Sequence, residues 1–241
     1  FDRCEDEFEG NYKGLVGTAL SLIYCSKTGI AENELLEMLA FDGEPLPSAI
    51  WSPLYLALES FLIIKSGLID LSHDFVRKAV IRKYLFINEK KTEIHNKIIE
   101  YWENAEITNK RAYEEYPWHL AQVGLWNDLS EFLTDESFLP TLWMKNPHNV
   151  LEYWTLIEND STIRRDFVYL GQDLSSTEYP VTYLHACYQI LNYTGDKENI
   201  KQIYHNITSR LWSEIRNFTP FSSVEVLTIK EELRFNLFEL S

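Results

Sequence analysis

The stretch Leu62-Ile63-Ile64-Lys65-Ser66-Gly67-Leu68-Ile69-Asp70-Leu71 decides how the first third of the chain folds. Two short runs of β-prone residues flank Lys65-Ser66-Gly67, which is the pattern of a β-hairpin with a tight turn. Ser72 follows as a good helix N-cap, and Asp74 falls beside the positive helix end. We therefore expect a helix from His73 to about Phe86.

Helical spacing of apolar residues predicts two helices before this hairpin, one over 15–23 and one over 31–40. Residues 41–52 contain Gly43, Pro45 and Pro47 and are expected to form a loop. Pro53 can occupy the first turn of a third helix, over 53–62. Three helices, a hairpin and a further helix predict a winged helix-turn-helix domain over residues 1–88.

The rest of the chain is expected to be helical. Apolar spacing and punctuating Gly and Pro predict helices over 92–103, 111–124, 125–134, 183–193 and 197–215. Paired helices indicate a solenoid, although no self-similarity at the ~34-residue tetratricopeptide period is evident. The expected fold class is mainly α: a winged helix-turn-helix with a small β-hairpin, followed by antiparallel helical hairpins. We expect a helical domain over 89–160 and tetratricopeptide-like repeats from 161 to 241.

Composition sets outer limits on function. The 241 residues include 22 Lys and Arg against 37 Asp and Glu, a formal net charge of -15, which repels nucleic acids and anionic membranes. No apolar run reaches the ~18 residues that a membrane-spanning helix needs. Three scattered cysteines and no signal-peptide pattern favour a cytoplasmic protein. The first residue is Phe1, so we expect a segment of a longer protein.

Catalytic and metal-binding motifs are missing from the sequence. Ser72, His73 and Asp74 are consecutive and cannot form a hydrogen-bonded catalytic relay. No phosphate-binding loop or nucleophile elbow occurs, and the six histidines lack metal-ligand spacing. His95 is expected on a helix flank, structural or facing solvent. We therefore predict no catalytic residue, no metal site and no enzyme activity in the chain.

Nucleic-acid binding is not expected either. The helix predicted over 53–62 would be the recognition helix, yet it has no Lys or Arg and one acidic residue, Glu59. A basic cluster of Arg77, Lys78, Arg82 and Lys83 follows the hairpin, and a solvated helix face explains it better than a nucleic-acid patch. A winged-helix nucleic-acid binder stays as a third alternative.

The position of His73 allows a second interpretation. A neutral imidazole at a helix N-terminus can donate a hydrogen bond outward beside free backbone N–H groups, which suits an anion such as a nucleotide phosphate. The residues alone favour a histidine that caps the helix or packs under the hairpin.

Two segments carry a resemblance to a known family. Residues 20–36 (LSLIYCSKTGIAENELL) and 67–77 (GLIDLSHDFVR) resemble the winged-helix domain of STAND signal-transduction ATPases with a NACHT or NB-ARC core. Residues 111–120 (RAYEEYPWHL) are similar to the helix that follows that domain in the repeat-containing NACHT group of nephrocystin-3 and telomerase protein component 1. The resemblance covers roughly residues 8 to 135.

This resemblance implies a regulatory and scaffolding role. His73 matches the family histidine that touches the ADP β-phosphate, and Asp74 matches the aspartate beside it, while Ser72 replaces the family's Met. It implies ADP or ATP in the full-length parent, bound mostly outside this chain and not by the chain alone. The implied partners are the parent's own NTPase domain, other proteins at the helical region, and further copies of the parent in a homo-oligomer.

A static helical protein-interaction module is the main alternative. Exposed aromatic residues would favour it, and Trp126, Trp143, Trp154 and Trp212 are the candidates. Tryptophans at helical spacing are more often core residues, so this alternative depends on where the structure places them.

Overall fold

The computed structural model describes residues 1–10, 12–104, 111–160, 179–194 and 203. These residues are mostly helical with one two-stranded sheet, which confirms the mainly α prediction. The chain divides into two compact units, Phe1–Leu129 and Ser130–Ser241, and each is described by itself. The domain limits predicted at 88 and 160 stay predictions. Most of 161–241, including the helix predicted over 197–215, lies outside the described residues.

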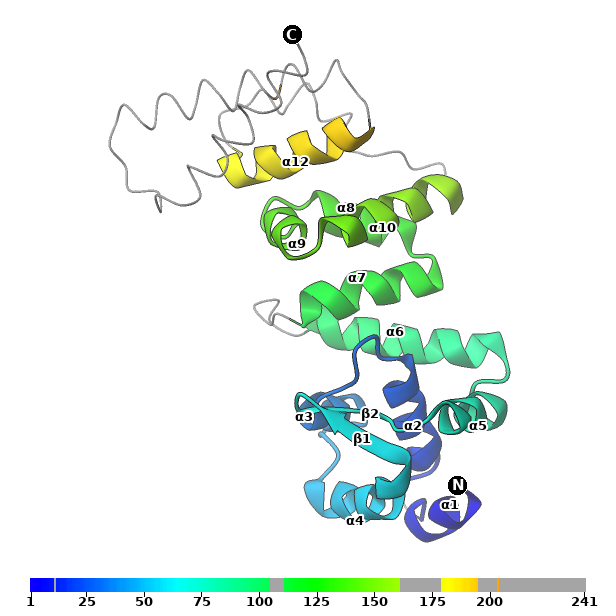
Figure 1. Cartoon of the computed structure of the whole chain (residues 1–241). Coiled ribbons are helices and arrows are strands. Elements are labelled where there is room, and N and C mark those ends of the chain that lie inside the picture. Colours follow the sequence, from blue (N-terminus) through cyan, green and yellow to red (C-terminus); the bar gives the residue numbers. More distant parts are fainter. Residues whose placement is uncertain (11, 105–110, 161–178, 195–202, 204–241) are drawn as a thin grey trace. The chain divides into compact units, whose positions relative to one another are not determined.

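The first unit is built around α2, which is apolar on almost every side. Its elements are α1 (Asp2–Phe8), α2 (Leu15–Cys25), α3 (Glu32–Met38), α4 (Ser48–Leu58), β1 (Leu62–Lys65), β2 (Leu68–Leu71), α5 (Asp74–Tyr84), α6 (Asn88–Asn104) and α7 (Ala112–Val123). Helices α1, α3, α5 and α6 and strand β2 all pack against α2 (Figure 1). The side chains of Val16, Leu20, Leu22 and Ile23 are fully buried. Cys25 is 1% exposed and is a small core residue.

The hairpin forms where the sequence predicts it. Strands β1 and β2 pair antiparallel from Leu62 opposite Leu71 to Lys65 opposite Leu68. Ser66 and Gly67 both have positive φ, 53° and 80°, as a tight two-residue hairpin turn requires. Ile30 adds a bridge on the other side of β2, its N–H donating to the Ile69 carbonyl at 3.0 Å.

Helix α4 begins earlier than the sequence analysis predicts. It starts at Ser48, directly after Pro47, so Pro53 lies inside the helix and not in its first turn. A proline is favoured in the first turn of a helix and disfavoured inside one, because it removes a backbone hydrogen bond and its ring crowds the carbonyl four residues before it. Pro53 lacks the N–H that would bond to the carbonyl of Ala49, and Ala49 is exposed where water can replace that donor.

The short helix α1 is held to α5 by charge. Lys83 pairs with the carboxylates of Asp2 and Glu5, and the Tyr84 hydroxyl donates to Glu5 Oε1 at 2.6 Å. Glu9 then accepts hydrogen bonds from the N–H groups of Gly14 and Val16 and so caps the N-terminus of α2.

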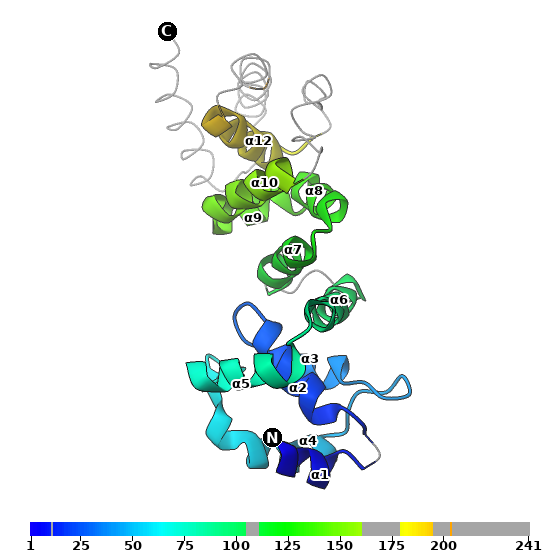
Figure 2. The same cartoon turned by 90° about the vertical axis from the view of Figure 1, so that its right-hand side faces the viewer.

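The second unit contributes α9 (Leu139–Lys145), α10 (Pro147–Asp160) and α12 (Val181–Thr194), and α8 (Trp126–Thr134) runs into it. Helix α9 packs against both α10 and α12 (Figure 2). The Tyr183 hydroxyl donates to the Thr134 carbonyl at 2.8 Å. Trp154 is fully buried, whereas Trp126 and Trp143 are half-buried. Trp212 lies outside the described residues.

Candidate functional site

Helix α7 carries a buried polar stripe. Arg111 stands at the N-cap of α7, and Glu115 and His119 follow at intervals of four residues, so the three side chains share one face. Glu115 is 1% exposed and His119 is fully buried. Residues of these types are seldom buried unless they are paired, so their partners define what the site does. We call Arg111, Glu115 and His119 the α7 polar stripe.

Glu115 binds the connection that leaves α2. Helix α2 ends at Cys25 and the Ser26 N–H still bonds to the Leu22 carbonyl, so Lys27 and Thr28 carry the first N–H groups that need an acceptor outside the helix. Glu115 Oε2 accepts from the Lys27 N–H at 2.9 Å. Glu115 Oε1 accepts from the Thr28 N–H at 3.0 Å and the Thr28 hydroxyl at 2.6 Å. Burial alone would raise the pKa of the Glu115 carboxyl, but His119, Thr28 and the Lys27 N–H outweigh it and lower the pKa.

Arg111 binds the start of α3. Its Nε and one terminal nitrogen donate to the two carboxylate oxygens of Glu34 at 2.8 and 3.0 Å, which is a bidentate pair. The same guanidinium donates to the Gly29 carbonyl at 2.8 Å and the Thr28 hydroxyl at 3.1 Å. Glu34 also accepts from the Ala31 N–H at 3.0 Å and so caps α3.

His119 extends the stripe to α6. Its Nε2 lies 3.3 Å from Glu115 Oε2, and its Nδ1 lies 2.7 Å from Nδ1 of His95. Burial lowers the pKa of His119, against the opposing effect of Glu115, so the ring is neutral near pH 7. A neutral His119 that donates from Nε2 to Glu115 must accept at Nδ1, so His95 donates from its own Nδ1.

His95 Nε2 is then a buried acceptor, and it has no hydrogen-bond partner among the described residues. Burial, then the nearby His119 and Lys91, lowers the pKa of His95 to about 3. His95 is 2% exposed, so it is structural and does not face solvent, in line with one of the two placements expected for it.

These contacts give the stripe a structural role. Both oxygens of Glu115 already accept from the protein, and the group is shielded from solvent. A saturated, buried carboxylate has no free lone pair to offer a substrate in this arrangement. The stripe instead joins α7 to the α2–α3 connection and to α6. No cluster of three metal-ligating side chains occurs in the part of the chain that the structure describes.

His73 and Asp74 lie elsewhere, on the surface. His73 is the N-cap residue of α5, and its exposed ring stacks on Phe75 with ring centroids 5.4 Å apart. Asp74 is exposed and pairs with Lys78 at 2.8 Å. The structure does not bring either residue to the α7 polar stripe. Their contact with a nucleotide phosphate, and with it ADP or ATP as a cofactor, stays a prediction.

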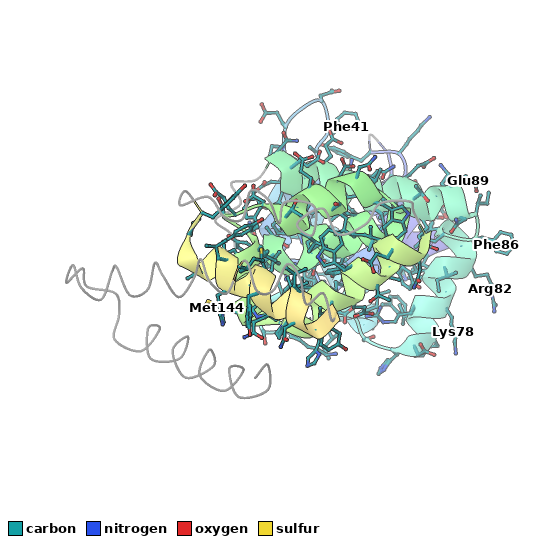
Figure 3. The ribbon with its side chains drawn as sticks, turned by 90° about the horizontal axis from the view of Figure 1, so that it is seen from above. Phe41, Lys78, Arg82, Phe86, Glu89 and Met144 are labelled. Carbon is teal, nitrogen blue, oxygen red and sulfur yellow. The ribbon has the colours of Figure 1, made fainter. Side chains whose placement is uncertain are left out.

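The basic cluster after the hairpin is largely neutralised. Arg77 pairs with Asp70, Lys78 with Asp74, and Lys83 with Asp2 and Glu5. Arg82 is exposed and makes no ion pair within the described residues (Figure 3). Paired cations are poorly suited to a phosphate backbone.

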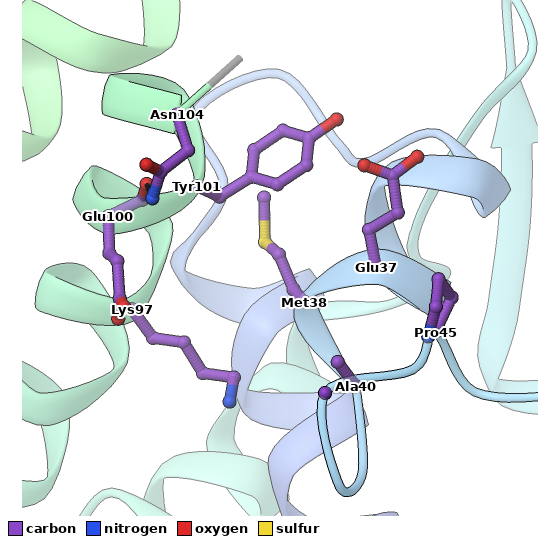
Figure 4. A pocket seen from close by; sticks show the side chains of 9 residues that line it. Glu37, Met38, Ala40, Pro45, Lys97, Glu100, Tyr101 and Asn104 are labelled. Atoms are coloured by element: carbon purple, nitrogen blue, oxygen red, sulfur yellow. Dashed lines mark hydrogen bonds between the residues drawn. The ribbon is translucent and has the colours of Figure 1, made fainter.

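A cavity of about 400 Å³ lies between α3 and α6 (Figure 4). Met38 and Tyr101 meet at its centre, and Glu37, Lys97 and Glu100 place charges of both signs around them. Burial, then the carboxylates of Glu37 and Glu34, raises the pKa of Tyr101 to about 12. This cavity lies apart from the residues of the stripe.

Comparisons with known proteins identify similar chains. A TPR repeat-containing protein of Dictyostelium discoideum is 30% identical over 162 residues, which is 66% of this chain and 10% of that protein. Tetratricopeptide repeat protein 41 is 26% identical in mouse and 28% identical in rat, each over 185 residues. The chain therefore covers only 10% of the length of the Dictyostelium protein and 14% of the length of each rodent protein. No family model matches the chain, and no solved structure matches it.

These similarities correct the family resemblance. The relatives are tetratricopeptide repeat proteins, so the expected membership in the NACHT and STAND ATPases is wrong. The description of the parent as a nucleotide-binding NTPase has no support from these relatives, and neither has the parent's own NTPase domain as a partner. Contact of His73 and Asp74 with a phosphate is tested by none of these similarities and stays a prediction. Among the residues that the structure describes, no helix is long and apolar enough to cross a membrane.

Proposed function

We propose that this chain is a non-catalytic helical module that binds other proteins within a longer repeat-containing protein. The similarity to TPR repeat-containing proteins over 66% of the chain carries this proposal. Stacked helical pairs of that kind expose extended surfaces that suit protein partners. The alternative of a static interaction module is thus preferred to a nucleotide-driven regulatory arm.

The finer architecture belongs to the same proposal. Helices α2, α3 and α4, the β1–β2 hairpin and α5 follow one another in the order of a winged helix-turn-helix domain. Helix α4 holds no Lys or Arg and exposes Leu56 at 67%, a surface that suits protein better than DNA. We take this part as a packing domain.

The α7 polar stripe gives the module a rigid joint. Arg111, Glu115 and His119 use directional hydrogen bonds, which fix one register between α7 and the α2–α3 connection where apolar contacts alone would allow sliding. A fixed joint keeps a binding surface preorganised, which lowers the cost of association.

Proximity labelling of the full-length parent in cells tests the function. We expect deletion of residues 1–241 to remove a subset of neighbouring proteins, and those proteins to bind the purified chain directly. The Arg111→Ala/Glu115→Ala double variant should weaken that binding, while exposed Glu131→Ala should not. An unchanged set of neighbours after the deletion would contradict the proposal, as would turnover of ATP by the purified chain.

A further inference from the structure

The small sheet of the first unit has an open edge. Strand β2 is paired on both sides, with β1 on one and with Ile30 on the other. Among the described residues, β1 is paired on one side only, with β2 (Figure 1). The outer side of an edge strand presents backbone N–H and C=O groups that have no partner in the sheet. Strand β1 is therefore the place where a further strand can be added.

The register of the hairpin shows which groups of β1 face outward. In an antiparallel pair, residues that exchange hydrogen bonds alternate along the strands with residues that do not. Ile69 exchanges its backbone bonds with Ile30, at 2.8 and 3.0 Å, so it makes none to Ile64, the residue opposite it on β1. The Ser72 N–H donates to the Phe61 carbonyl at 2.8 Å, as the same alternation requires. The N–H and C=O of Ile64 thus point out of the open edge.

The open edge is accessible and mostly apolar. Ile64 is 57% exposed and Ile63 is 38% exposed, although β-branched residues of a sheet usually pack against a neighbouring strand. By the same alternation the Leu62 carbonyl also points outward, while the Leu62 N–H donates to the Glu59 carbonyl. The edge thus offers one N–H and two C=O groups beside two exposed isoleucines, which suits a short extended backbone.

Lys65 adds a charge that the hairpin does not neutralise. It is the one charged residue of β1, it is exposed, and it forms no ion pair with any described residue. Asp70, the acidic residue of β2, pairs with Arg77 of α5 instead. Ile63 and Lys65 are two positions apart and so share one face of the sheet. An acidic side chain placed across from Lys65 would complete a cross-strand pair.

We propose that the open edge of β1, defined as Leu62–Lys65, binds an extended segment of a partner protein as an added antiparallel strand. One residue of that segment exchanges both backbone hydrogen bonds with Ile64. The residue before it lies across from Lys65 and is Asp or Glu, and the residue after it lies across from Ile63 and is β-branched or aromatic. This inference rests on the proposed function, since it names the surface and the partner chemistry of the interaction module.

Other occupants of the edge fit less well. Two copies of the chain each carry a net charge of -15 and repel one another, which opposes pairing of β1 with β1 of a second copy. A nucleic acid needs several cations along its phosphates, and β1 supplies Lys65 alone. Backbone hydrogen bonding to an extended peptide needs neither a second copy nor a basic surface.

Panning of a random linear peptide library on the purified chain supplies the probe peptides. We expect them to be enriched in an acidic residue followed, two positions later, by Val, Ile, Thr, Tyr or Phe. Ile64→Pro removes the outward N–H and no bond to β2, and proline is tolerated at such edge positions. In fluorescence anisotropy it should weaken peptide binding at least about tenfold, equivalent to about 1.4 kcal/mol.

Three further variants separate backbone from side-chain contributions. Ile64→Thr keeps the N–H and the β-branched shape, so it should weaken peptide binding less than Ile64→Pro does. Lys65→Glu should weaken binding of the acidic peptides by placing like charges across the two strands. Phe86→Ser removes an apolar side chain that is 81% exposed beyond the end of α5, and it should leave binding unchanged.

Hydrogen exchange of the unaltered chain gives a readout that does not depend on any variant. With a recovered peptide bound, the Ile64 amide should exchange at least about tenfold more slowly by NMR, because it gains an acceptor. The amides of Ile63 and Lys65 are already bonded to β2 by the alternation and should change less.

The outcomes separate the edge from the function. Peptides that bind Ile64→Pro as tightly as wild type, with circular dichroism showing that the variant is folded, overturn the edge and leave a protein-binding module intact. An unchanged exchange rate of the Ile64 amide, peptides without the expected pattern, or no recovered peptide also overturn the proposal. A dimer of the chain alone that Ile64→Pro dissociates in analytical ultracentrifugation would assign the edge to a second copy instead.

Discussion

Glu115 is the residue on which most of the buried hydrogen bonds of the stripe converge. Its carboxylate satisfies the N–H groups of Lys27 and Thr28 and the Thr28 hydroxyl, and it lies 3.8 Å from Arg111. Removal of one partner of a buried charged network leaves the others desolvated and unpaired, which costs more than the pair itself contributes.

Glu115→Ala should therefore destabilise the chain by about 3 kcal/mol. Glu115→Gln keeps one acceptor oxygen and should cost less. Urea denaturation followed by circular dichroism measures both, with exposed Glu131→Ala as a control that should stay within about 0.5 kcal/mol. Equal stabilities of Glu115→Ala and wild type would refute a structural role for the stripe.

His95 makes stability depend on pH. Its pKa is about 3 in the folded chain, against an ordinary value of 6.5, because burial disfavours the charged ring. Below pH 6.5 the unfolded chain binds a proton that the folded chain does not, so stability is full above that pH and falls as the pH drops toward 3.

From pH 7 to pH 5 we expect a loss of about 2 kcal/mol from His95 alone. Urea titrations at several pH values measure it. The exposed His148→Gln variant should show the same profile as wild type. The Glu115 carboxyl, with its lowered pKa, should add a further loss only at lower pH, below the ordinary range of a Glu. A flat profile between pH 7 and pH 5 would show that His95 is not held neutral by burial.

At the scale of elements, the contact of α2 with α5 depends on Gly17, which has no side chain. A Cβ built on Gly17 would lie 2.9 and 3.0 Å from two ring carbons of Tyr84. Tyr84 cannot move away freely, because its hydroxyl donates to Glu5 on α1.

Gly17→Ala should thus destabilise the chain by about 1 kcal/mol or more through overpacking, even though Ala favours a helix over Gly. Gly10→Ala is the matched control, since no atom lies within 4 Å of a Cβ there. Thermal denaturation distinguishes the two. A rise in Tm for Gly17→Ala would mean that the α2–α5 contact yields without strain.

Local sequence patterns predict the helices and strands better than they predict the contacts between them. The hairpin follows from Lys65-Ser66-Gly67 because a tight turn is decided by adjacent residues. The start predicted for α4 at Pro53 is wrong, because Pro47 is the N-cap residue and Pro53 is accommodated inside the helix. The partners of Arg111 and Glu115 lie 77 to 88 residues away, and no local pattern records such a distance. The four-residue spacing of Arg111, Glu115 and His119 is the sequence signal from which their shared helix face could be predicted.

At the scale of the whole molecule, the net charge of -15 opposes polyanions. Three of the four cations in the cluster after the hairpin are also paired with carboxylates. We expect no binding of the chain to random duplex DNA at about 0.15 M salt, where charges are screened beyond roughly 8 Å. Fluorescence anisotropy of labelled DNA measures this. Tight binding that weakens steeply with added salt would contradict it.

The distance along the chain between the two sides of the stripe has a consequence during synthesis. Lys27 emerges 88 residues before Glu115, the residue that accepts from its N–H. At 5–20 residues per second, a ribosome needs roughly 4–18 s to make that stretch. For that time the N–H groups of Lys27 and Thr28 and the carboxylate of Glu34 lack their partners on α7, so water must satisfy the connection after α2 in a nascent chain.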